Sequence, residues 1–449
     1  MAPLLPSTER TLLARVARAQ RDGRCPSLVA GVVRDGALVW STGRGEVGEP
    51  HTDVQYRLGS ISKTVTAITV LRLRDEGLLD LDDRLDRHLP GTPLGERTLG
   101  QLLSHLGGAG SESPGAWWER TPGGSLDELG LTDADRVLPA ARRFHYSNLG
   151  FGLLGELVAR ARGRSWDEVA RDEVLLPLGM TRTTPRPDGR AAQGYAVHPW
   201  ADVLQIEPEH HAGVMAPAGQ LWATATDLGR LGTFLLGDSD GVLSPDTVEE
   251  MTHPAGIDFS SPGWSSYGLG VQVQRPSQEG RPGVTLVGHG GSMPGFLAGL
   301  WADREEGTAA LALANVTSGL DSALPSQLLA DLRDAEPRVV DAWSPSGTAV
   351  PLELLGPWYW GPSPYVLRAI AGGLLHLGGL GRPGRSSRFR ARPDGTWVGL
   401  DGYFSGETLR LGEDSLNLAS FVFTRTPYDP AVPVPGGVDE RGWHAVTFG

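Results

Sequence analysis

The chain has 449 residues, of which 40% are hydrophobic and 21% charged. This is ordinary globular composition, and the length predicts two or three domains. The formal net charge of −13 argues against nucleic acid or an anionic membrane as a partner, because the field of the protein would repel both. The single cysteine, Cys25, excludes an internal disulfide framework and a multi-cysteine zinc site, and we expect no metal or cofactor.

The N-terminal segment, MAPLLPSTERTLLARVARAQ, has an amphipathic helical pattern that Glu9, Arg15 and Arg18 interrupt. It lacks the continuous apolar stretch of a signal peptide. The chain also contains no run of about 18 apolar residues, the length that a membrane-spanning helix needs. We therefore expect a cytoplasmic protein with no membrane partner.

Two apolar runs flank Arg34-Asp35-Gly36 in residues 28–40, which predicts a β-hairpin. Residues 60–76 show helical spacing of apolar side chains, and Gly77 supplies the stop signal. Further helical patterns lie at 99–106, 150–161, 166–175 and 226–236, and strand-like runs lie at 268–274, 285–288, 296–302 and 309–315. Helices between N-terminal and C-terminal strands predict one antiparallel sheet built from both ends of the domain, with a helical insertion.

The pattern breaks at residues 337–350, a linker rich in Pro, Ser and Gly. Beyond the linker, short apolar runs alternate with turns and show no helical periodicity; they lie at 358–360, 365–370, 374–377, 389–391, 397–400, 408–411 and 416–423. Such spacing is typical of an all-β sandwich or small barrel. We therefore expect an α+β catalytic domain at 1–336 and an all-β domain at 351–449.

The only lysine of the chain is Lys63, three residues after Ser60 at the start of the predicted helix. Residues three apart share one face of a helix, so these two side chains can meet. A serine hydroxyl is a poor nucleophile until a base takes its proton. Lysine can be that base if burial lowers its pKa from about 10.4, whereas arginine is always protonated. Alone, the Ser-x-x-Lys pattern also fits a capping serine beside a solvated lysine.

Two further motifs favour the catalytic interpretation. Tyr146 and Asn148 form the only Tyr-x-Asn pair of the chain, which has only three asparagines. A tyrosine beside a lysine ammonium can have a lowered pKa and share the role of base, and an asparagine can hold the amide group of a substrate. The third motif is His289-Gly290-Gly291-Ser292, at the end of a predicted strand. Gly290 and Gly291 would allow another backbone to approach closely, as a substrate that pairs along the strand edge requires.

In this order, Ser-x-x-Lys, Tyr-x-Asn and His-Gly-Gly resemble the serine acyl-enzyme family of penicillin-binding proteins and class C β-lactamases. The resemblance covers roughly residues 10–335 and includes the segments LLSHLGGAG, FHYSNLGFGLLGELV and GHGGSMPGF. It implies a β-lactamase-like catalytic domain. It also implies that Ser60 is acylated, with Lys63 and Tyr146 as general-base pair and Asn148 positioning Lys63 and the substrate amide. The oxyanion hole would consist of the backbone N–H groups of Ser60 and Ser292.

The sequence departs from the family pattern at His289, where typical β-lactamases and carboxypeptidases have lysine. The loss of that fixed charge argues against efficient β-lactam hydrolysis and against recognition of a free carboxylate. A histidine at this position suggests a neutral hydrogen-bond donor or a proton shuttle to the leaving group.

Other motifs are better explained without catalysis. Ser239 lies in a Gly-x-Ser-x-Gly pattern, but a helical pattern precedes it rather than the strand that a lipase nucleophile elbow requires. Glu207, Glu209, His210 and His211 are expected to form a solvated polar loop rather than a metal site. His105 and His198 are expected to be structural or pocket-lining residues.

The substrate is less determined than the chemistry. The size and layout resemble standalone penicillin-binding-protein-type thioesterases, which have a lipocalin-like barrel and cyclise a peptidyl thioester head to tail through a D-configured C-terminal residue. This resemblance implies a peptidyl carrier protein as partner. A cyclase must keep water off the acyl-enzyme, which would make the Trp117-Trp118 loop, Trp118 included, and the β-domain walls of the site; simple packing of the two tryptophans is the alternative. Arg441, in the C-terminal tail, would hold peptide carbonyls. The alternatives are a cytosolic esterase, D-aminopeptidase or DD-peptidase-type hydrolase acting on peptide or ester substrates, and an inactive binding module.

Overall fold

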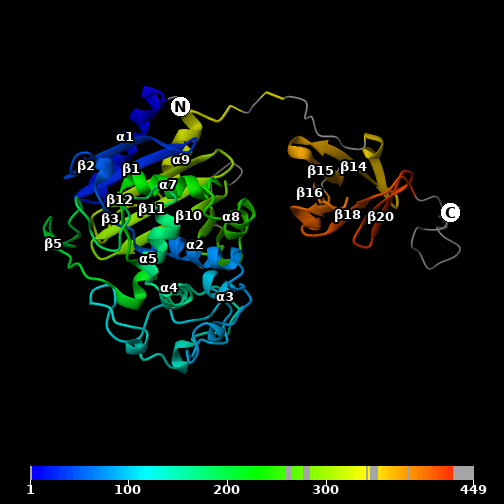
Figure 1. Ribbon diagram of the computed structural model, residues 1–449. Helices are drawn as coiled ribbons and strands as arrows, with labels where there is room; N and C mark the ends of the chain where they lie inside the picture. The colour runs from blue at the N-terminus through cyan, green and yellow to red at the C-terminus, as the bar shows by residue number, and fades with distance from the viewer. Residues whose placement is uncertain are drawn as a thin grey trace, which may run out of the picture. The chain divides into compact units, whose positions relative to one another are not determined.

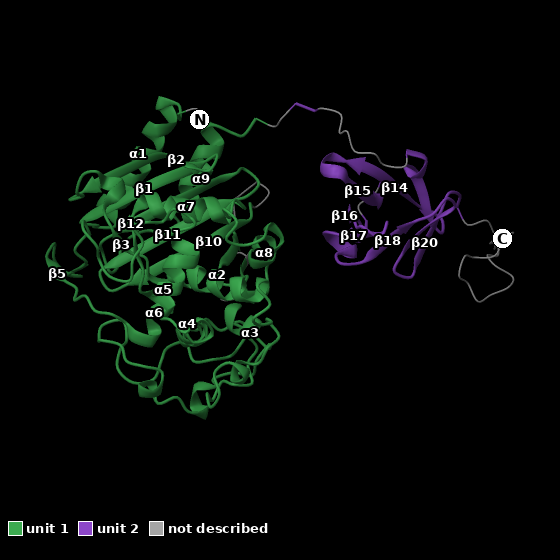
Figure 2. Cartoon of the chain, in the orientation of Figure 1, with its two compact units in different colours: residues 1–339 green, residues 340–449 purple. Residues whose placement is uncertain are grey.

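The computed structural model describes residues 3–258, 264–276, 284–339, 342–343, 352–381 and 384–427. The chain divides into two compact units, residues 1–339 and 340–449 (Figure 2), which are described separately. Within the described residues, no helix is long and apolar enough to cross a membrane.

The first unit is built on an antiparallel sheet of eight strands in the described residues (Figure 1). Their order is β2 (Ala37–Gly45), β1 (Ser27–Arg34), β12 (Thr308–Ala314), β11 (Phe296–Asp303), β10 (Leu286–Met293), β9 (Gln272–Arg275), β8 (Trp264–Tyr267) and β7 (Gly256–Asp258). Leu28 of β1 pairs with Ala314 of β12, so the two ends of the domain meet in the sheet. The predicted sheet with strands from both ends is confirmed.

Helices cover both faces of this sheet (Figure 1). Alternate residues of β1 point to opposite faces, as the two-residue period of a strand requires. Leu28 and Val32 pack with helices α1 (Pro6–Asp22) and α9 (Leu324–Ala335) in one apolar cluster. Val29 and Val33 belong to a larger cluster that contains α7 (Ala225–Leu235) and the helical insertion. The site described below lies on the side of this second cluster.

The helical insertion surrounds one buried helix, α2 (Ser62–Asp75), in which every residue from Ser62 to Leu71 is buried. A short 3-10 turn, Gly59–Ile61, precedes it, and Gly77 with φ +73° follows it at the predicted stop. The other helices of the unit are α3 (Leu99–Leu103), α4 (Asn148–Arg162), α5 (Trp166–Ala170), a π-helical turn (Arg171–Leu175), α6 (Ala216–Gly219) and α8 (Pro245–Met251). Two small sheets pair β3 (Tyr56–Arg57) with β6 (Trp222–Ala223), and β4 (Tyr195–Val197) with β5 (Leu204–Ile206).

The second unit contains a closed antiparallel barrel, which confirms the predicted all-β module. Its strands are β13 (Gly356–Trp360), β14 (Ser363–Ile370), β15 (Leu374–Gly379), β16 (Ser387–Ala391), β17 (Trp397–Gly399), β18 (Thr408–Leu411), β19 (Ser415–Leu418) and β20 (Phe421–Thr424). Trp358, Phe389 and Phe423 are buried in its centre, so side chains fill the barrel.

The last apolar run of the sequence, 416–423, is two strands and not one. Chain reversal occurs at Ala419, which has φ +51°. The turn was missed because its two central residues, Ala419 and Ser420, include only one weak turn former, the serine.

Candidate active site

Ser60 lies in the turn that leads into α2, pressed against strand β10. Gly59 has φ +56°, a conformation that glycine adopts readily, and a Cβ atom on it would lie 2.5 Å from the backbone nitrogen of Ser292. The turn that carries Ser60 and the amide of Ser292 are therefore in direct contact. This proximity fits the expected oxyanion hole, in which both backbone N–H groups face one developing negative charge.

Lys63 lies one helical turn after Ser60 and points back at it. Its Nζ is 3.0 Å from Ser60 Oγ, 2.6 Å from Asn148 Oδ1 and 2.7 Å from the carbonyl oxygen of Ala218. A neutral amine has two N–H donors and one lone pair. Asn148 and Ala218 can accept from the two N–H groups, which leaves the lone pair for the proton of the Ser60 hydroxyl.

Burial lowers the pKa of Lys63 from 10.5 to about 7, because the ammonium is removed from water. The carboxylates of Glu112 and Glu119 act in the opposite direction, since a nearby negative charge favours the protonated amine. Near neutral pH, a large fraction of Lys63 is therefore in the neutral form that can accept a proton.

Tyr146 contacts the same hydroxyl. Its side chain is hydrogen-bonded to Ser60, and its ring centroid lies 4.9 Å from Lys63 Nζ. Burial raises the pKa of Tyr146, which is the opposite of the lowering expected from the sequence, because the desolvation of a phenolate outweighs the effect of the hydrogen bond. The geometry thus makes Tyr146 a neutral phenol that can pass a proton, with Lys63 as the base.

His289 lies on β10 with its side chain only 2% exposed. Its Nδ1 is hydrogen-bonded to the carbonyl oxygen of Gly290, which can only accept, so Nδ1 carries the proton and Nε2 accepts from the Tyr267 hydroxyl at 2.9 Å. Burial, with a smaller effect of Lys63, lowers the pKa of His289 to about 3, and the ring is neutral. Both nitrogens are engaged, so no free donor is offered to a leaving group as the sequence had suggested.

The two glycines after His289 have different roles. A Cβ on Gly291 would lie 1.9 Å from the carbonyl oxygen of Leu58, so only glycine allows β10 to approach the Ser60 turn this closely. A Cβ on Gly290 would meet nothing within 4 Å. The close packing around the nucleophile therefore depends on Gly291.

Glu112 is part of the site although no sequence motif marked it. Its Oε1 accepts from Asn148 Nδ2 at 2.8 Å, and its Oε2 accepts from Trp118 Nε1 at 2.7 Å. Asn148 thus holds Lys63 through its oxygen, as expected, and one of the two N–H groups of its amide donates to Glu112. Trp118 is 6% exposed and lies beside the site, whereas its neighbour Trp117 is 58% exposed.

His105 packs against the aromatic side chains of the site. The ring is buried and lies 4.2 Å from the ring of Tyr146 and 4.4 Å from that of Tyr267, centroid to centroid. Its Nδ1 accepts from the backbone N–H of Ser147 at 3.0 Å. Burial lowers the pKa of His105 well below its usual value. It is a neutral, structural histidine, as the sequence predicted.

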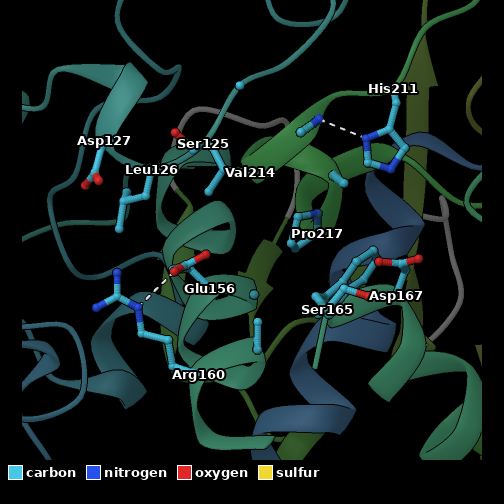
Figure 3. A pocket seen from close by; sticks show the side chains of 16 residues that line it. Ser125, Leu126, Asp127, Glu156, Arg160, Ser165, Asp167, His211, Val214 and Pro217 are labelled. Carbon is cyan, nitrogen blue, oxygen red and sulfur yellow. Dashed lines mark hydrogen bonds and ion pairs between the residues drawn. The ribbon is translucent and has the colours of Figure 1, made fainter. Parts of the chain in front are cut away.

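A separate pocket of about 340 Å³ lies between α4, α5 and the segments around residues 124–127 and 211–217 (Figure 3). Glu156 and Arg160, which line it, form an ion pair with each other at 2.8 Å. The pocket touches the active site only indirectly, through the segment that continues to Ala218. None of Ser60, Lys63 and Tyr146 lines this pocket.

The remaining candidates lie elsewhere. Ser239 follows α7 in a turn and donates to the carbonyl oxygen of Leu243 at 2.6 Å, so it is not a nucleophile elbow. The expectation of a solvated loop is wrong for Glu207, which is 8% exposed, forms an ion pair with Arg120 and accepts from Thr317. In the described part of the chain, no cluster of potential metal ligands occurs. Arg441 lies outside the described residues.

Comparison with known proteins identifies the family of the first unit. Residues 12–333 match the family model described as Beta-lactamase, and residues 348–425 match a Domain of unknown function (DUF7586). "Beta-lactamase-like protein 2" of Dictyostelium discoideum is 28% identical over 58% of this chain, and "Penicillin-binding protein 4" of Amycolatopsis lactamdurans is 27% identical over 73%. The chain spans 50% of the first relative and 90% of the second.

The solved structures that are similar in fold include SurE and a D-stereospecific amidohydrolase. SurE is 25% identical with a TM-score of 0.58, and the alignment covers 94% of this chain and 99% of SurE. A D-stereospecific amidohydrolase from Streptomyces sp. is 26% identical with a TM-score of 0.59, and the alignment covers 74% of this chain and 98% of that protein. The family match over residues 12–333 shows that this chain belongs to the beta-lactamase family, whose members are serine hydrolases.

Proposed function

We propose that the chain is a serine acyl-enzyme hydrolase or acyltransferase in which Ser60 is acylated and Lys63 is the base. The observation that carries this proposal is the buried Lys63 amine, whose Nζ lies 3.0 Å from Ser60 Oγ and whose pKa is lowered to about 7. A capping serine beside a solvated lysine, the alternative left by the sequence, would require an exposed ammonium.

The geometry supports the following acylation step. Ser60 Oγ adds to the carbonyl carbon of the substrate while its proton moves to Lys63 Nζ. The negative charge on the former carbonyl oxygen faces the N–H groups of Ser60 and Ser292. The leaving group then departs with a proton that Lys63 returns through the Tyr146 hydroxyl. An ester between Ser60 and the acyl group remains, and water or an amine releases it by the reverse sequence.

For the acceptor, we infer peptide macrocyclisation as the first candidate. The enzyme would take a peptidyl thioester with a D-residue at its C-terminus from a carrier protein and transfer the acyl group to the N-terminal amine of the same peptide. The similarity to SurE supports this because it extends over 94% of the chain, beyond the catalytic unit, and SurE has been solved with D-Leu.

The second candidate is hydrolysis of D-configured amino-acid amides or esters, with water as acceptor. The likeness to the D-stereospecific amidohydrolase supports it, as does the carboxylate that Glu112 adds to the site.

Intact-protein mass spectrometry with a fluorophosphonate tests the acyl-enzyme chemistry. We expect one adduct, absent in Ser60→Ala. An unlabelled wild-type protein would favour the inactive binding module.

Turnover of a peptidyl N-acetylcysteamine thioester with a D-residue at its C-terminus then separates the two acceptors. Cyclic product identifies the macrocyclase, and linear acid alone for every peptide identifies the hydrolase.

A further inference from the structure

A second pocket, also of about 340 Å³, has a buried positive charge in its wall. It is lined by residues of β3, β6 and the β10–β11 turn, together with the segments 187–194 and 206–209. Arg57 of β3 is one of the lining residues and is only 1% exposed. None of the catalytic side chains described above lines this pocket. It is therefore distinct from the active site, and its buried arginine has no part in the acylation step.

The guanidinium of Arg57 has a neutral partner and an unused donor. Its Nη2 donates to Gln220 Oε1 at 3.0 Å, and its Nε has no hydrogen-bond partner. Burial lowers the pKa of Arg57 to about 10, and Glu209 and Glu119 oppose this only through the charge of their carboxylates. The side chain therefore stays charged at neutral pH. Buried arginines are normally paired with a carboxylate. Arg162, whose Nε is also without a partner, has two glutamates at 2.8 Å.

Trp222 adds a second unused donor beside the first. It is the partner of Arg57 in the antiparallel pair of β3 and β6, so the two side chains lie next to each other on one face. Trp222 is 2% exposed, lines the same pocket, and its indole Nε1 has no hydrogen-bond partner. Its ring packs edge-on against Phe296, with the centroids 4.8 Å apart. Two buried N–H donors in the wall of one pocket both lack the acceptor that buried polar groups normally have.

The rest of the pocket favours an anion with an apolar body. Its wall includes the apolar side chains of Ile206 and Phe296. Two carboxylates also line the pocket. Glu207 is neutralised by its ion pair with Arg120, and Glu209 is exposed, so solvent screens its charge. The uncompensated charge inside the pocket is therefore that of the guanidinium.

We propose that this pocket binds a small monocarboxylic acid, with the carboxylate at Arg57 and Trp222 and the apolar body against Phe296. A carboxylate only accepts hydrogen bonds, so it can take both free donors, and its charge compensates the buried guanidinium. This inference goes beyond the proposed function. It requires no acylation of Ser60, and it holds whether water or an amine accepts the acyl group.

Isothermal titration calorimetry of the full chain tests the site with three probes of equal length. In a carboxylate-free buffer at neutral pH, we expect hexanoate to bind at one site. Hexanamide has the same body without the charge, and hexylamine has the opposite charge. Both should bind at least about tenfold more weakly, because a hydrogen bond between charged groups is lost. Equal affinity for hexanoate and hexanamide would overturn the proposal.

Two substitutions assign the binding to the two donors. Trp222→Phe keeps the ring against Phe296 but removes the indole N–H, and it should raise the Kd of hexanoate about tenfold. Arg57→Met removes the charge and should abolish the binding of hexanoate. If Arg57→Met does not fold, Trp222→Phe decides the test alone. An unchanged Kd in Trp222→Phe would refute the assignment.

Trp166→Phe is the matched control. The indole of Trp166 is also buried and its Nε1 also has no partner, but it lines the other pocket, the one shown in Figure 3. We expect this variant to bind hexanoate as the wild type does. A loss of affinity equal to that in Trp222→Phe would overturn the proposal, because a general effect of removing a buried indole N–H would then explain both.

Labelling of Ser60 separates this inference from the proposed function. With hexanoate at saturation, fluorophosphonate should still label Ser60 completely, because the two ligands occupy different pockets. If hexanoate blocks the labelling, the acid binds in the active site and the assignment to a separate pocket is wrong. If the wild-type protein is not labelled even without hexanoate, the proposed function is wrong, and calorimetry still decides whether the pocket binds the acid.

Discussion

Lowering the pH below 7 should inactivate the enzyme by protonating Lys63. Burial brings the pKa of Lys63 from 10.5 to about 7, which corresponds to about 5 kcal/mol at about 1.4 kcal/mol per pKa unit. Only the neutral amine can accept the proton of Ser60. With a pKa of about 7, its fraction falls to roughly 10% at pH 6 and roughly 1% at pH 5. The rate of acylation should fall about tenfold per pH unit below 7 and level off above pH 8.

The assay is the second-order rate constant for fluorophosphonate labelling of Ser60, followed by intact-protein mass spectrometry from pH 5 to 9. This reagent brings no titrating amine of its own. Other groups near Ser60 should not contribute, because the pKa of His289 is about 3 and burial raises that of Tyr146. Lys63→Arg, measured in parallel, should have no limb near pH 7, because its guanidinium stays protonated.

A second measurement checks that the loss of Ser60 labelling at low pH is not caused by unfolding of the protein. Because the folded pKa of Lys63 lies below its unfolded value, the unfolded state binds more protons between about pH 7 and 10.5. Stability should therefore increase with rising pH through that window, and this group contributes no change below it. If labelling stays constant from pH 5 to 8 while the protein remains folded by circular dichroism, the assignment of neutral Lys63 as base is refuted.

Four further substitutions test the base, the packing of β10 and the alternative nucleophile. Lys63→Arg should reduce labelling of Ser60 by at least about 10³-fold although the positive charge is kept. General-base catalysis contributes about 10²–10⁴-fold, and the larger guanidinium must also displace Asn148. Substantial activity of this variant would contradict the role of Lys63 as base. Gly291→Ala should destabilise the protein by several kcal/mol or abolish folding, because its Cβ would lie 1.9 Å from the carbonyl oxygen of Leu58. Gly290→Ala, whose Cβ would meet nothing within 4 Å, should unfold at the wild-type temperature. Equal melting temperatures of the two variants would count against the close packing of β10 on the Ser60 turn. Ser239→Ala should lose about 1 kcal/mol of stability with its hydrogen bond to Leu243 but keep full activity; an inactive variant would revive the alternative nucleophile.

The parts of the fold and site that the sequence predicted have local physical signals. Residues 28–40 contain a turn whose Asp35 and Gly36 both have positive φ, and the hairpin followed from them. Lys63 was identifiable because arginine, which the chain uses everywhere else, cannot lose its proton. Its closeness to Ser60 follows from the three-residue spacing across the 3-10 turn and the start of α2.

The parts that could not be predicted depend on tertiary contacts. Glu112 lies 36 residues before Asn148 in a loop, and no spacing relates the two before the chain folds. The direction of the Tyr146 pKa depends on whether desolvation or a neighbouring charge is stronger, and only the folded environment decides this. Glu207 was expected in solvent because loop glutamates usually are, but Arg120 provides the ion pair that allows its burial.

The position of Glu112 reconciles a carboxylate near the active site with a neutral base at Lys63. A buried carboxylate in direct contact with Lys63 would stabilise the ammonium and raise its pKa, which would remove the base. Asn148 separates the two groups, and solvent at the exposed carboxylate screens its charge, so burial remains the largest effect on Lys63.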